Sequence, residues 1–545
     1  MKTSLEIEQS IEKLPITEVA RTLGLDPDGI NLHGKYIAKL PLSILHERAD
    51  EPDGNLVLVT SMTPTRSGEG KTTVAISLAD ALTRLGQKAA LCIREPSLGP
   101  YFGMKGGGTG GGYAQVTPAE DINLHFTGDM YGVSKANNLL SSMIDNHLYF
   151  GNALHLDSRR VTWKRVIDLN DRALRDIIVG LGGTANGFPR RDGFDITPAS
   201  EVMTILSLSR DTADLHERLK RIIVGYTFEG EPVTCAQMKS DAAMVILLRD
   251  AIQPNLVQTL EHTPAIIHGG AFGNIAHGCN TLFATRMALK LADYAVTEAG
   301  FGSDLGAEKF FDIKCRAGGL KPSAAVIVAT VRALKHHGDG SPEDGFANLA
   351  KHIENVRCFG VSPIVAINRF ADDTDEELDS IRHKCEMAGV PSAVCDSFDR
   401  GGAGAEELAR TVMKVARDGS SSLRFLYPLD LPVREKMEVI ATRMYGAAGV
   451  AYDRRVLASI GQIERLGFGN LPICVAKTQA SLSDRADLRG VPKDFTVTVN
   501  EVRLCAGAGL IVIRCGDVVT MPGLPRVSAA ELMQVDSSGQ TTTLA

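Results

Sequence analysis

The segment from position 63 to position 73, Thr-Pro-Thr-Arg-Ser-Gly-Glu-Gly-Lys-Thr-Thr, has the residue types and spacing needed to bind a triphosphate. Its glycines let the backbone approach phosphates closely and turn its N–H groups toward them. Lys71 can reach the β and γ phosphates, and the Thr72 hydroxyl can bind Mg²⁺. The predicted nucleotide-binding residues are Thr65, Arg66, Ser67, Gly68, Glu69, Gly70, Lys71 and Thr72.

The flanks of this loop predict the elements that would hold it. Residues 56–59 form an apolar run typical of a buried parallel strand, and Val74, Leu78, Leu82 and Leu85 recur at helical spacing. The loop would therefore lie at a helix N-terminus, where oriented amides favour an anion. The usual phosphate loop carries one more glycine, where this chain has Thr65. The alternative is a glycine-rich turn with an incidental lysine.

Composition narrows the class of protein. The chain has 545 residues, a formal net charge of −7 and 44% hydrophobic residues, typical of a globular protein of several domains. No cluster of Lys and Arg indicates nucleic-acid binding, and no apolar run is long enough to span a membrane. The ten cysteines are scattered without a Cys-x-x-Cys pair, so we expect neither disulfides nor a zinc site. We expect a cytoplasmic protein without a signal peptide.

Strand and helix patterns repeat along the chain. A second apolar run, residues 89–93, completes a βαβ unit with the loop, and similar runs occur at 265–267, 294–296, 325–328 and 363–367. Residues 11–25 are predicted to form an opening helix. The predicted fold class is α/β, with a P-loop NTPase-like parallel sheet flanked by helices and two smaller C-terminal α/β domains.

The later part of the chain changes in pattern. Residues 374–389 and 404–417 predict amphipathic helices around a short strand at 392–395, and β-like runs follow at 495–499 and 510–513. We therefore predict a nucleotide-binding domain over residues 1–360 and a small α/β domain over 361–455. The remaining residues, 456–545, are predicted to form a β-rich α+β domain.

Two further segments carry candidate chemistry. Arg94 follows the second strand, and its guanidinium could bind a phosphoryl group or a carboxylate; the alternative is a structural ion pair with Glu95 or the sheet edge. The second segment is the glycine tract at 103–112. It is either a flexible linker or a functional loop, and the polar, ionisable residues on both sides of it favour the loop.

Several stretches together resemble the formate–tetrahydrofolate ligase family. The similarity is carried by Arg-Glu-Pro-Ser-Leu-Gly-Pro at 94–100, the glycine tract through Val116, and Glu-Asp-Ile-Asn-Leu-His-Phe-Thr-Gly-Asp at 120–129. It continues through residues 162–166, 297–302, 304–310, 328–335 and 469–479, and so covers essentially the whole chain.

The departures from that family concern the glycine tract and the folate pocket. Gly108 and Thr109 stand where relatives typically have two alanines, and Gly338 is followed by Asp339 where relatives have paired glycines. Relatives hold the folate ring between two aromatic side chains. Phe370 matches the first, and Phe398 stands nearest to the place of a tryptophan that is usually the second. Phe can stack on a pterin with less area than Trp.

The resemblance implies ATP-dependent ligation of formate to tetrahydrofolate, giving 10-formyltetrahydrofolate, ADP and phosphate through formyl phosphate. It implies that Lys71 stabilises the transferring phosphoryl group and that Arg94 binds formate and then formyl phosphate. Asp129 would orient the N10 amine or take its proton, and Glu95 would help to bind an activating monovalent cation, K⁺ or NH₄⁺. Thr72 would hold Mg²⁺. Relatives are usually homotetramers, which sets the expectation for this chain.

Two other functions fit the phosphate loop. One is another ATP-dependent carboxylate-activating ligase, of the dethiobiotin-synthetase type. The other is a non-enzymatic ATPase switch of the partitioning type. Such switches commonly carry an extra lysine near the start of the loop, where this chain has Thr65 and Arg66, and they are usually much shorter.

Overall fold

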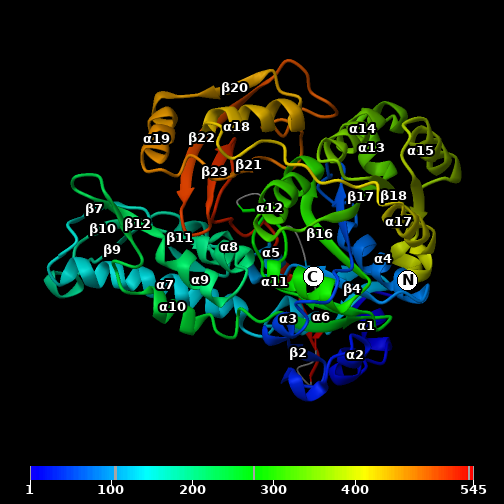
Figure 1. Cartoon of the computed structure of the whole chain (residues 1–545), viewed down its shortest axis with the longest axis horizontal. Coiled ribbons are helices and arrows are strands. Elements are labelled where there is room, and N and C mark those ends of the chain that lie inside the picture. Colours follow the sequence, from blue (N-terminus) through cyan, green and yellow to red (C-terminus); the bar gives the residue numbers. More distant parts are fainter. Residues whose placement is uncertain (1, 104–106, 274–275, 538–540, 544–545) are drawn as a thin grey trace.

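A long, mostly parallel sheet organises the molecule (Figure 1). The computed structural model of the chain describes residues 2–103, 107–273, 276–537 and 541–543. Across those ranges, no helix is both long and apolar enough to cross a membrane.

The central sheet has 12 strands, with its main path in the order β1-β2-β14-β15-β4-β16-β3-β17-β18-β19. Every neighbouring pair from β15 to β19 along that path is parallel. The strands are β1 (Asn31–His33), β2 (Ile37–Lys39), β3 (Asn55–Ser61), β4 (Ala89–Ile93), β5 (Gly110–Gly111), β6 (Ala114–Thr117), β14 (Asn255–Thr259), β15 (Pro264–Ile267), β16 (Tyr294–Gly302), β17 (Pro322–Ala329), β18 (Pro363–Asn368) and β19 (Ser392–Cys395). The predicted α/β class with a parallel sheet is confirmed.

Alternation along β3 divides the core into two layers. Val57 and Val59 face one hydrophobic cluster, whereas Leu56 and Leu58 face the other, because successive side chains of a strand point to opposite faces. Helices α4 (Lys71–Arg84) and α17 (Glu406–Asp418) cover the first face. Helices α11 (Leu282–Leu291) and α14 (Pro342–Cys358) cover the second.

Shorter helices surround this sheet. They are α1 (Ser4–Ser10), α2 (Ile16–Thr22), α3 (Ser43–Glu47), α5 (Leu98–Phe102), α6 (Ala119–Asn123), α12 (Arg316–Gly318), α13 (Val331–His337), α15 (Asp375–Met387) and α16 (Ser397–Arg400). The helix predicted over residues 11–25 is wrong in its first part. The helix begins only at Ile16 and ends at Thr22. Pro15 precedes it; its nitrogen carries no hydrogen to donate, which suits the start of a helix.

The part of the chain that follows β6 and precedes β14 in sequence forms an arm with a hydrophobic cluster. It is drawn in cyan and green at the left of Figure 1. Its strands are β7 (Leu156–Val161), β8 (Arg165–Ile167), β9 (Ile177–Val179), β10 (Arg190–Asp192), β11 (Phe194–Ile196), β12 (Ile223–Thr227) and β13 (Pro232–Thr234). Its helices are α7 (Asp129–Tyr149), α8 (Glu201–Leu208), α9 (Thr212–Lys220) and α10 (Asp241–Leu247).

A second sheet forms near the C-terminus, in the order β20-β22-β23-β21. Its strands are β20 (Gly449–Tyr452), β21 (Ile473–Ala476), β22 (Thr496–Cys505) and β23 (Leu510–Cys515), accompanied by α18 (Val433–Ile440), α19 (Arg454–Arg465) and the small pair β24 (Gln534–Val535) and β25 (Thr541–Thr543). Strands β18 and β19 extend the central sheet beyond residue 360, and β20 begins before residue 456. The three-domain division at 360 and 455 stays a prediction.

Candidate active site

The phosphate loop lies between β3 and α4, as the sequence predicts. Gly70 caps the helix in the left-handed region, with φ of 71°, where a side chain would be strained. A Cβ at this position would also collide with the Asn368 side-chain amide at the end of β18, which donates a hydrogen bond of 3.0 Å to the Glu69 carbonyl. Glycine at position 70 is therefore required both by the backbone conformation and by the close approach of Asn368.

Lys71 and Thr72 converge on one carboxylate. The Lys71 ammonium lies 3.0 Å from Oε2 of Glu298, and the Thr72 hydroxyl donates to the same oxygen at 2.9 Å. Burial acts to raise the pKa of the Glu298 carboxyl, but the charges of Lys71 and Arg94 and the hydrogen bonds from Lys71 and Thr72 hold its pKa below the ordinary value. Glu298 therefore stays ionised beside the two phosphate-loop side chains.

Glu298 is the site residue that the sequence reasoning did not select. It lies within β16, which pairs in parallel with β3, so its side chain reaches the edge from which the phosphate loop emerges. The available signal was an acidic residue two positions after the apolar run 294–296. A hydroxyl and a carboxylate together are the hard oxygen ligands that Mg²⁺ prefers, and Mg²⁺ at phosphate sites keeps several waters. Thr72 and Glu298 thus fit a Mg²⁺ ion shared with a nucleotide.

Arg94 follows β4 and approaches the same edge. Its Nη1 donates to the Ala271 carbonyl at 3.2 Å, and its buried Nε has no acceptor among the described residues. A Cβ at Gly300 in β16 would lie 3.5 Å from Nη2 of Arg94. The guanidinium thus keeps an unused donor beside the end of the strand that carries Glu298, where an anionic ligand would satisfy it.

Glu95 and Asp129 form a buried acidic pair. Lys39 makes an ion pair of 2.7 Å with Oδ1 of Asp129, and Asn255 donates to Oδ2 at 2.8 Å. Burial raises the pKa of the Glu95 carboxyl well above its ordinary value, and the neighbouring Asp129 raises it further. Oε2 of Glu95 has no hydrogen-bond partner within the described ranges. Lys39 and Asn255 therefore occupy both oxygens of Asp129, whereas burial favours the protonated form of Glu95.

Glu69 holds the loop itself rather than facing outward. The Thr65 N–H donates to Oε1 of Glu69 at 2.6 Å, and the Thr330 hydroxyl donates to Oε2 at 2.5 Å. Glu69 is buried, whereas Arg66 and Ser67 at the tip of the loop are exposed. The predicted loop residues thus lie together. Glu69 stabilises the loop from inside through its hydrogen bonds, whereas Arg66 and Ser67 are exposed to solvent.

Phe370 and Phe398 lie in different surroundings. The Arg332 guanidinium sits over the Phe370 ring, 4.5 Å from its centroid, and also donates to the Gly68 carbonyl of the phosphate loop. Phe398 is 45% exposed, and its carbonyl accepts a hydrogen bond of 2.8 Å from the Tyr113 N–H. Within the described part of the chain, no ring contact joins the two aromatics.

The glycine tract is only partly described, since Met104, Lys105 and Gly106 lie outside the described residues. From Gly110 the chain forms β5, which pairs with β6 and so joins the sheet at β14. A Cβ at Gly112, where φ is 60°, would collide with the Phe398 carbonyl. This end of the tract is an ordered part of the sheet edge and not a free linker.

Two of the positions that depart from the family pattern, Gly108 and Thr109, are accommodated locally. A Cβ at Gly108 would lie 3.2 Å from Cβ of Pro96, which is tight but close to an allowed contact. The Thr109 hydroxyl accepts a hydrogen bond of 3.0 Å from the Asn123 amide, whose oxygen accepts from the Gly108 N–H at 3.0 Å. Thr109 therefore adds a hydrogen bond that an alanine could not make.

Within the described ranges, no three or more His, Cys, Asp or Glu side chains lie close enough together to hold a metal ion. The cysteines show no disulfide among the described residues.

Comparison with known protein families gives one match that covers almost the whole chain. The sequence model of the family described as formate–tetrahydrofolate ligase matches residues 2–545.

Proposed function

Because this chain belongs to the formate–tetrahydrofolate ligase family, an ATP-dependent ligase family, we propose that its reaction passes through formyl phosphate at the edge where Lys71, Arg94 and Glu298 meet. Formate, ATP and tetrahydrofolate are its substrates. The family match decides against the two alternatives, a dethiobiotin-synthetase-type ligase and a partitioning switch.

The first step suits a site that supplies charge rather than a base. Formate is ionised at neutral pH, so its oxygen can attack the γ-phosphorus of ATP without losing a proton, while the bond to the β–γ bridging oxygen breaks. Lys71 stabilises the charge on the transferring phosphoryl group. Arg94 orients formate through its unused donors, and a bidentate guanidinium–carboxylate pair fixes that orientation.

Thr72 and Glu298 are the residues proposed to hold Mg²⁺. When bound, the ion would neutralise charge on the β and γ phosphates. In the structure the Lys71 ammonium pairs with Glu298 at 3.0 Å, so the lysine already lies beside the residues proposed to hold Mg²⁺. Release of Lys71 from Glu298 to the phosphates is then a short movement within one site.

The second step joins the formyl group to the folate. N10 of tetrahydrofolate attacks the formyl carbon, the carbon–oxygen bond to phosphate breaks, and phosphate leaves with that oxygen. Asp129 is proposed to orient the N10 amine; each of its oxygens already accepts one hydrogen bond and retains further acceptor capacity. Phe370 and Phe398 are proposed to stack on the pterin, after the Arg332 guanidinium leaves the Phe370 face.

A monovalent cation, K⁺ or NH₄⁺, is proposed to bind at Glu95. Its buried Oε2 is without a partner among the described residues, which suits an oxygen ligand to such an ion. The residues present fit this group, because a cation there would favour the ionised carboxylate that burial otherwise opposes. The homotetramer and the cytoplasmic location are likewise carried forward as proposals.

The observation that carries this function is the convergence of Lys71 and Thr72 on Glu298 beside Arg94. The test of the intermediate uses formate labelled with ¹⁸O in both oxygens, together with ATP and tetrahydrofolate. We expect one ¹⁸O atom in each phosphate released, because the formate oxygen that attacked phosphorus leaves with the phosphate. Phosphate free of label, with 10-formyltetrahydrofolate formed and converted by acid to its absorbing methenyl form, would exclude formyl phosphate while leaving the ligase activity intact.

A further inference from the structure

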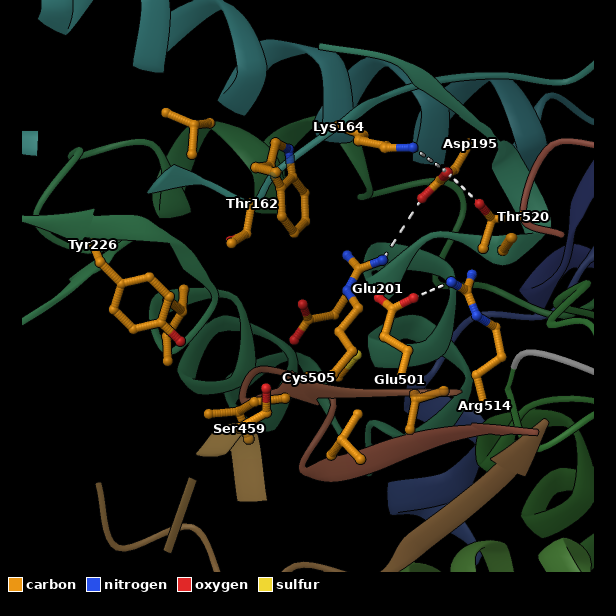
Figure 2. A pocket seen from close by; sticks show the side chains of 18 of the residues that line it. Thr162, Lys164, Asp195, Glu201, Tyr226, Ser459, Glu501, Cys505, Arg514 and Thr520 are labelled. Atoms are coloured by element: carbon orange, nitrogen blue, oxygen red, sulfur yellow. Dashed lines mark hydrogen bonds and ion pairs between the residues drawn. The ribbon is translucent and has the colours of Figure 1, made fainter. Parts of the chain in front are cut away.

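A cavity of about 830 Å³ lies away from the site described above. Figure 2 shows it between the arm, which contributes Thr162, Lys164 and Asp195, and the C-terminal strands β22 and β23, which contribute Glu501 and Arg514. None of the predicted catalytic or nucleotide-binding residues lines it. Its volume falls within the range typical of metabolite-binding sites.

Most of the cations that line the cavity have a carboxylate of their own. Arg159 pairs with Asp157 at 2.8 Å, Arg190 with Asp145 at 2.7 Å, Arg191 with Asp176 at 2.5 Å, and Arg514 with Glu501. Lys164 and Arg503 differ from these. They share one carboxylate, Asp195, at 3.6 and 3.7 Å, beyond hydrogen-bond distance, and Asp195 already accepts a hydrogen bond of 2.7 Å from the Thr520 hydroxyl.

Of the cations that line the cavity, Arg503 has the most unused hydrogen-bond donors. Its side chain retains 34% of its exposure, opening into the cavity, and its guanidinium donates no hydrogen bond to another described residue. The second carboxylate nearby, Glu201, accepts the backbone N–H groups of Gly507 and Ala508 through its Oε1, at 2.8 and 3.2 Å, and forms no ion pair with Arg503 within the described residues. The planar fork of Arg503 therefore lines the cavity with donors that make no hydrogen bond within the described residues and that a ligand or water can satisfy.

The other residues that line the cavity indicate the chemistry of the ligand beyond its anionic group. Trp163 and Tyr226 contribute aromatic surface, and Leu510 and Val512 contribute aliphatic surface. Among the described residues, Lys164 and Arg503 share a single ion-pair partner, Asp195, so one positive charge is left over. A single carboxylate would compensate it, whereas a dianion would bring an uncompensated negative charge. We propose that this cavity is an effector site for a small organic monocarboxylate with an apolar body, bound through Arg503 and Lys164.

The wall of the cavity also contacts the segment that holds Arg94. Glu201 and Thr204 of α8 line the cavity, and on the same helix Sδ of Met203 accepts from the Gly270 N–H at 3.2 Å. Next to this contact, the Phe272 N–H donates to the Pro198 carbonyl at 3.2 Å, and the Ala271 carbonyl accepts from Arg94. A ligand that shifts α8 therefore acts on the loop against which the formate-binding candidate rests.

The chain carries its own probe for this cavity, because Trp163 is its single tryptophan and lies in the cavity wall. We would titrate the full-length protein with cyclohexanecarboxylate, which does not absorb at the tryptophan excitation wavelength, and follow the emission of Trp163. We expect a saturable change, absent with the uncharged cyclohexanecarboxamide. Arg503→Met should weaken this binding by about tenfold or more, since a charge-assisted hydrogen bond is lost.

Arg159→Met is the matched control, because Arg159 lines the same cavity but is 79% exposed and paired with Asp157. It should bind as the wild type does. If Arg503→Met fails to fold by circular dichroism, Lys164→Met tests the same contact. No saturable change in the wild type, an equal response to the carboxamide or to inorganic phosphate, or unweakened binding by the folded variant would overturn the proposed site.

The effector role is tested by the formate KM of the ligase reaction in the presence of cyclohexanecarboxylate. We expect a shift in the wild type that is lost in Arg503→Met. A shift of the same size in Arg503→Met would mean direct competition at the formate site and would overturn the effector role, as would no shift at all. The emission readout does not depend on the proposed roles of Lys71 and Arg94, so the two proposals can fail separately.

Discussion

At the scale of single residues, the candidate active site is a balance of charges at one sheet edge. Glu298 holds both Lys71 and Thr72 through a single oxygen, and Arg94 lies close enough to lower its pKa. Phosphates entering this edge would exchange one anionic partner of Lys71 for another. This arrangement supports the proposed nucleotide site, because its charged groups are already in place.

Replacing Lys71 with Ala should abolish formate-dependent phosphate release, by about a hundredfold or more, because a preorganised charge on the transferring group is lost. The measurement is phosphate release with formate, ATP and tetrahydrofolate all present. Lys321→Ala, an exposed position, is the control and should keep full activity. Retention of most of the turnover by folded Lys71→Ala would remove Lys71 from the catalytic role.

Replacing Arg94 with Ala should raise the formate KM and lower kcat, because the guanidinium would no longer orient the attacking carboxylate. Arg94→Lys keeps the charge without the planar fork, and we expect it to recover only part of the loss. Steady-state kinetics with formate as the varied substrate measure both changes. Formate kinetics that match the wild type in Arg94→Ala would show that Arg94 does not bind formate.

Replacing Glu298 with Gln should raise the Mg²⁺ concentration needed for half-maximal activity, since a neutral amide is a weaker ligand than a carboxylate. The same change frees Lys71 from its ion partner. Activity measured over a Mg²⁺ series at fixed ATP provides the test. An unchanged Mg²⁺ requirement would contradict the assignment of Glu298, and Thr72→Ser, which keeps the hydroxyl, serves as the conservative comparison.

At the scale of elements, helix α4 carries a second feature besides the phosphate loop. Asp80 is fully buried on α4, and burial raises the pKa of its carboxyl to about 7, although hydrogen bonds from Thr259 and Thr263 act in the opposite direction. The Thr259 hydroxyl donates to Oδ1 at 2.6 Å, and Oδ2 has no partner in the described part of the chain. The helix therefore favours a protonated Asp80.

Asp80→Asn should change the pH dependence of stability. An acid whose pKa is raised on folding binds its proton more tightly in the native state, so the wild type loses stability as pH rises from about 4 to about 7. Asn carries no such penalty, and relative to the wild type the variant should gain about 4 kcal/mol across this window. Urea unfolding of both proteins at a series of pH values measures this difference in the free energy of unfolding. The exposed Asp28→Asn is the control, and a pH-independent difference for Asp80→Asn would contradict the expectation.

The other elements explain why the predicted patterns were sufficient in some places and not in others. The runs at 56–59 and 89–93 became β3 and β4 because a parallel strand covered on both faces reads as a continuous apolar run. The short strand at 392–395 was also predicted, but its pattern did not indicate that β19 pairs with β18 and extends the central sheet. Pairing depends on distant strands, which local periodicity does not contain.

At the scale of the whole molecule, a buried ion pair joins the C-terminal sheet to the central one. Lys477, just after β21, lies 2.7 Å from Oδ2 of Asp304, just after β16, and the two side chains are 0% and 2% exposed. Lys477 also donates to the Ser481 carbonyl at 2.6 Å. The charge of each partner is therefore compensated only while the two sheets remain docked.

Lys477→Met should destabilise the protein by about 3–5 kcal/mol, because Asp304 is left buried without its partner. The double variant Lys477→Met/Asp304→Asn should recover part of that loss, since no charge remains unpaired. Denaturant unfolding of the four proteins of this cycle gives the coupling free energy. A double variant whose loss equals the sum of the two single losses would show that the pair does not couple the sheets.

The sequence by itself determined the phosphate loop, the α/β class and, through stretches spread over its length, the family that residues 2–545 match. These features depend on residues that are neighbours in the chain, where spacing alone specifies a turn, a strand or a helix. The tertiary structure decided which side chains meet: Lys71 with Glu298 across 227 positions, Lys39 with Asp129 across 90, and Arg503 with Asp195 in the cavity. Such contacts follow from strand order and sheet docking, so their energies act between segments whose proximity no local pattern encodes.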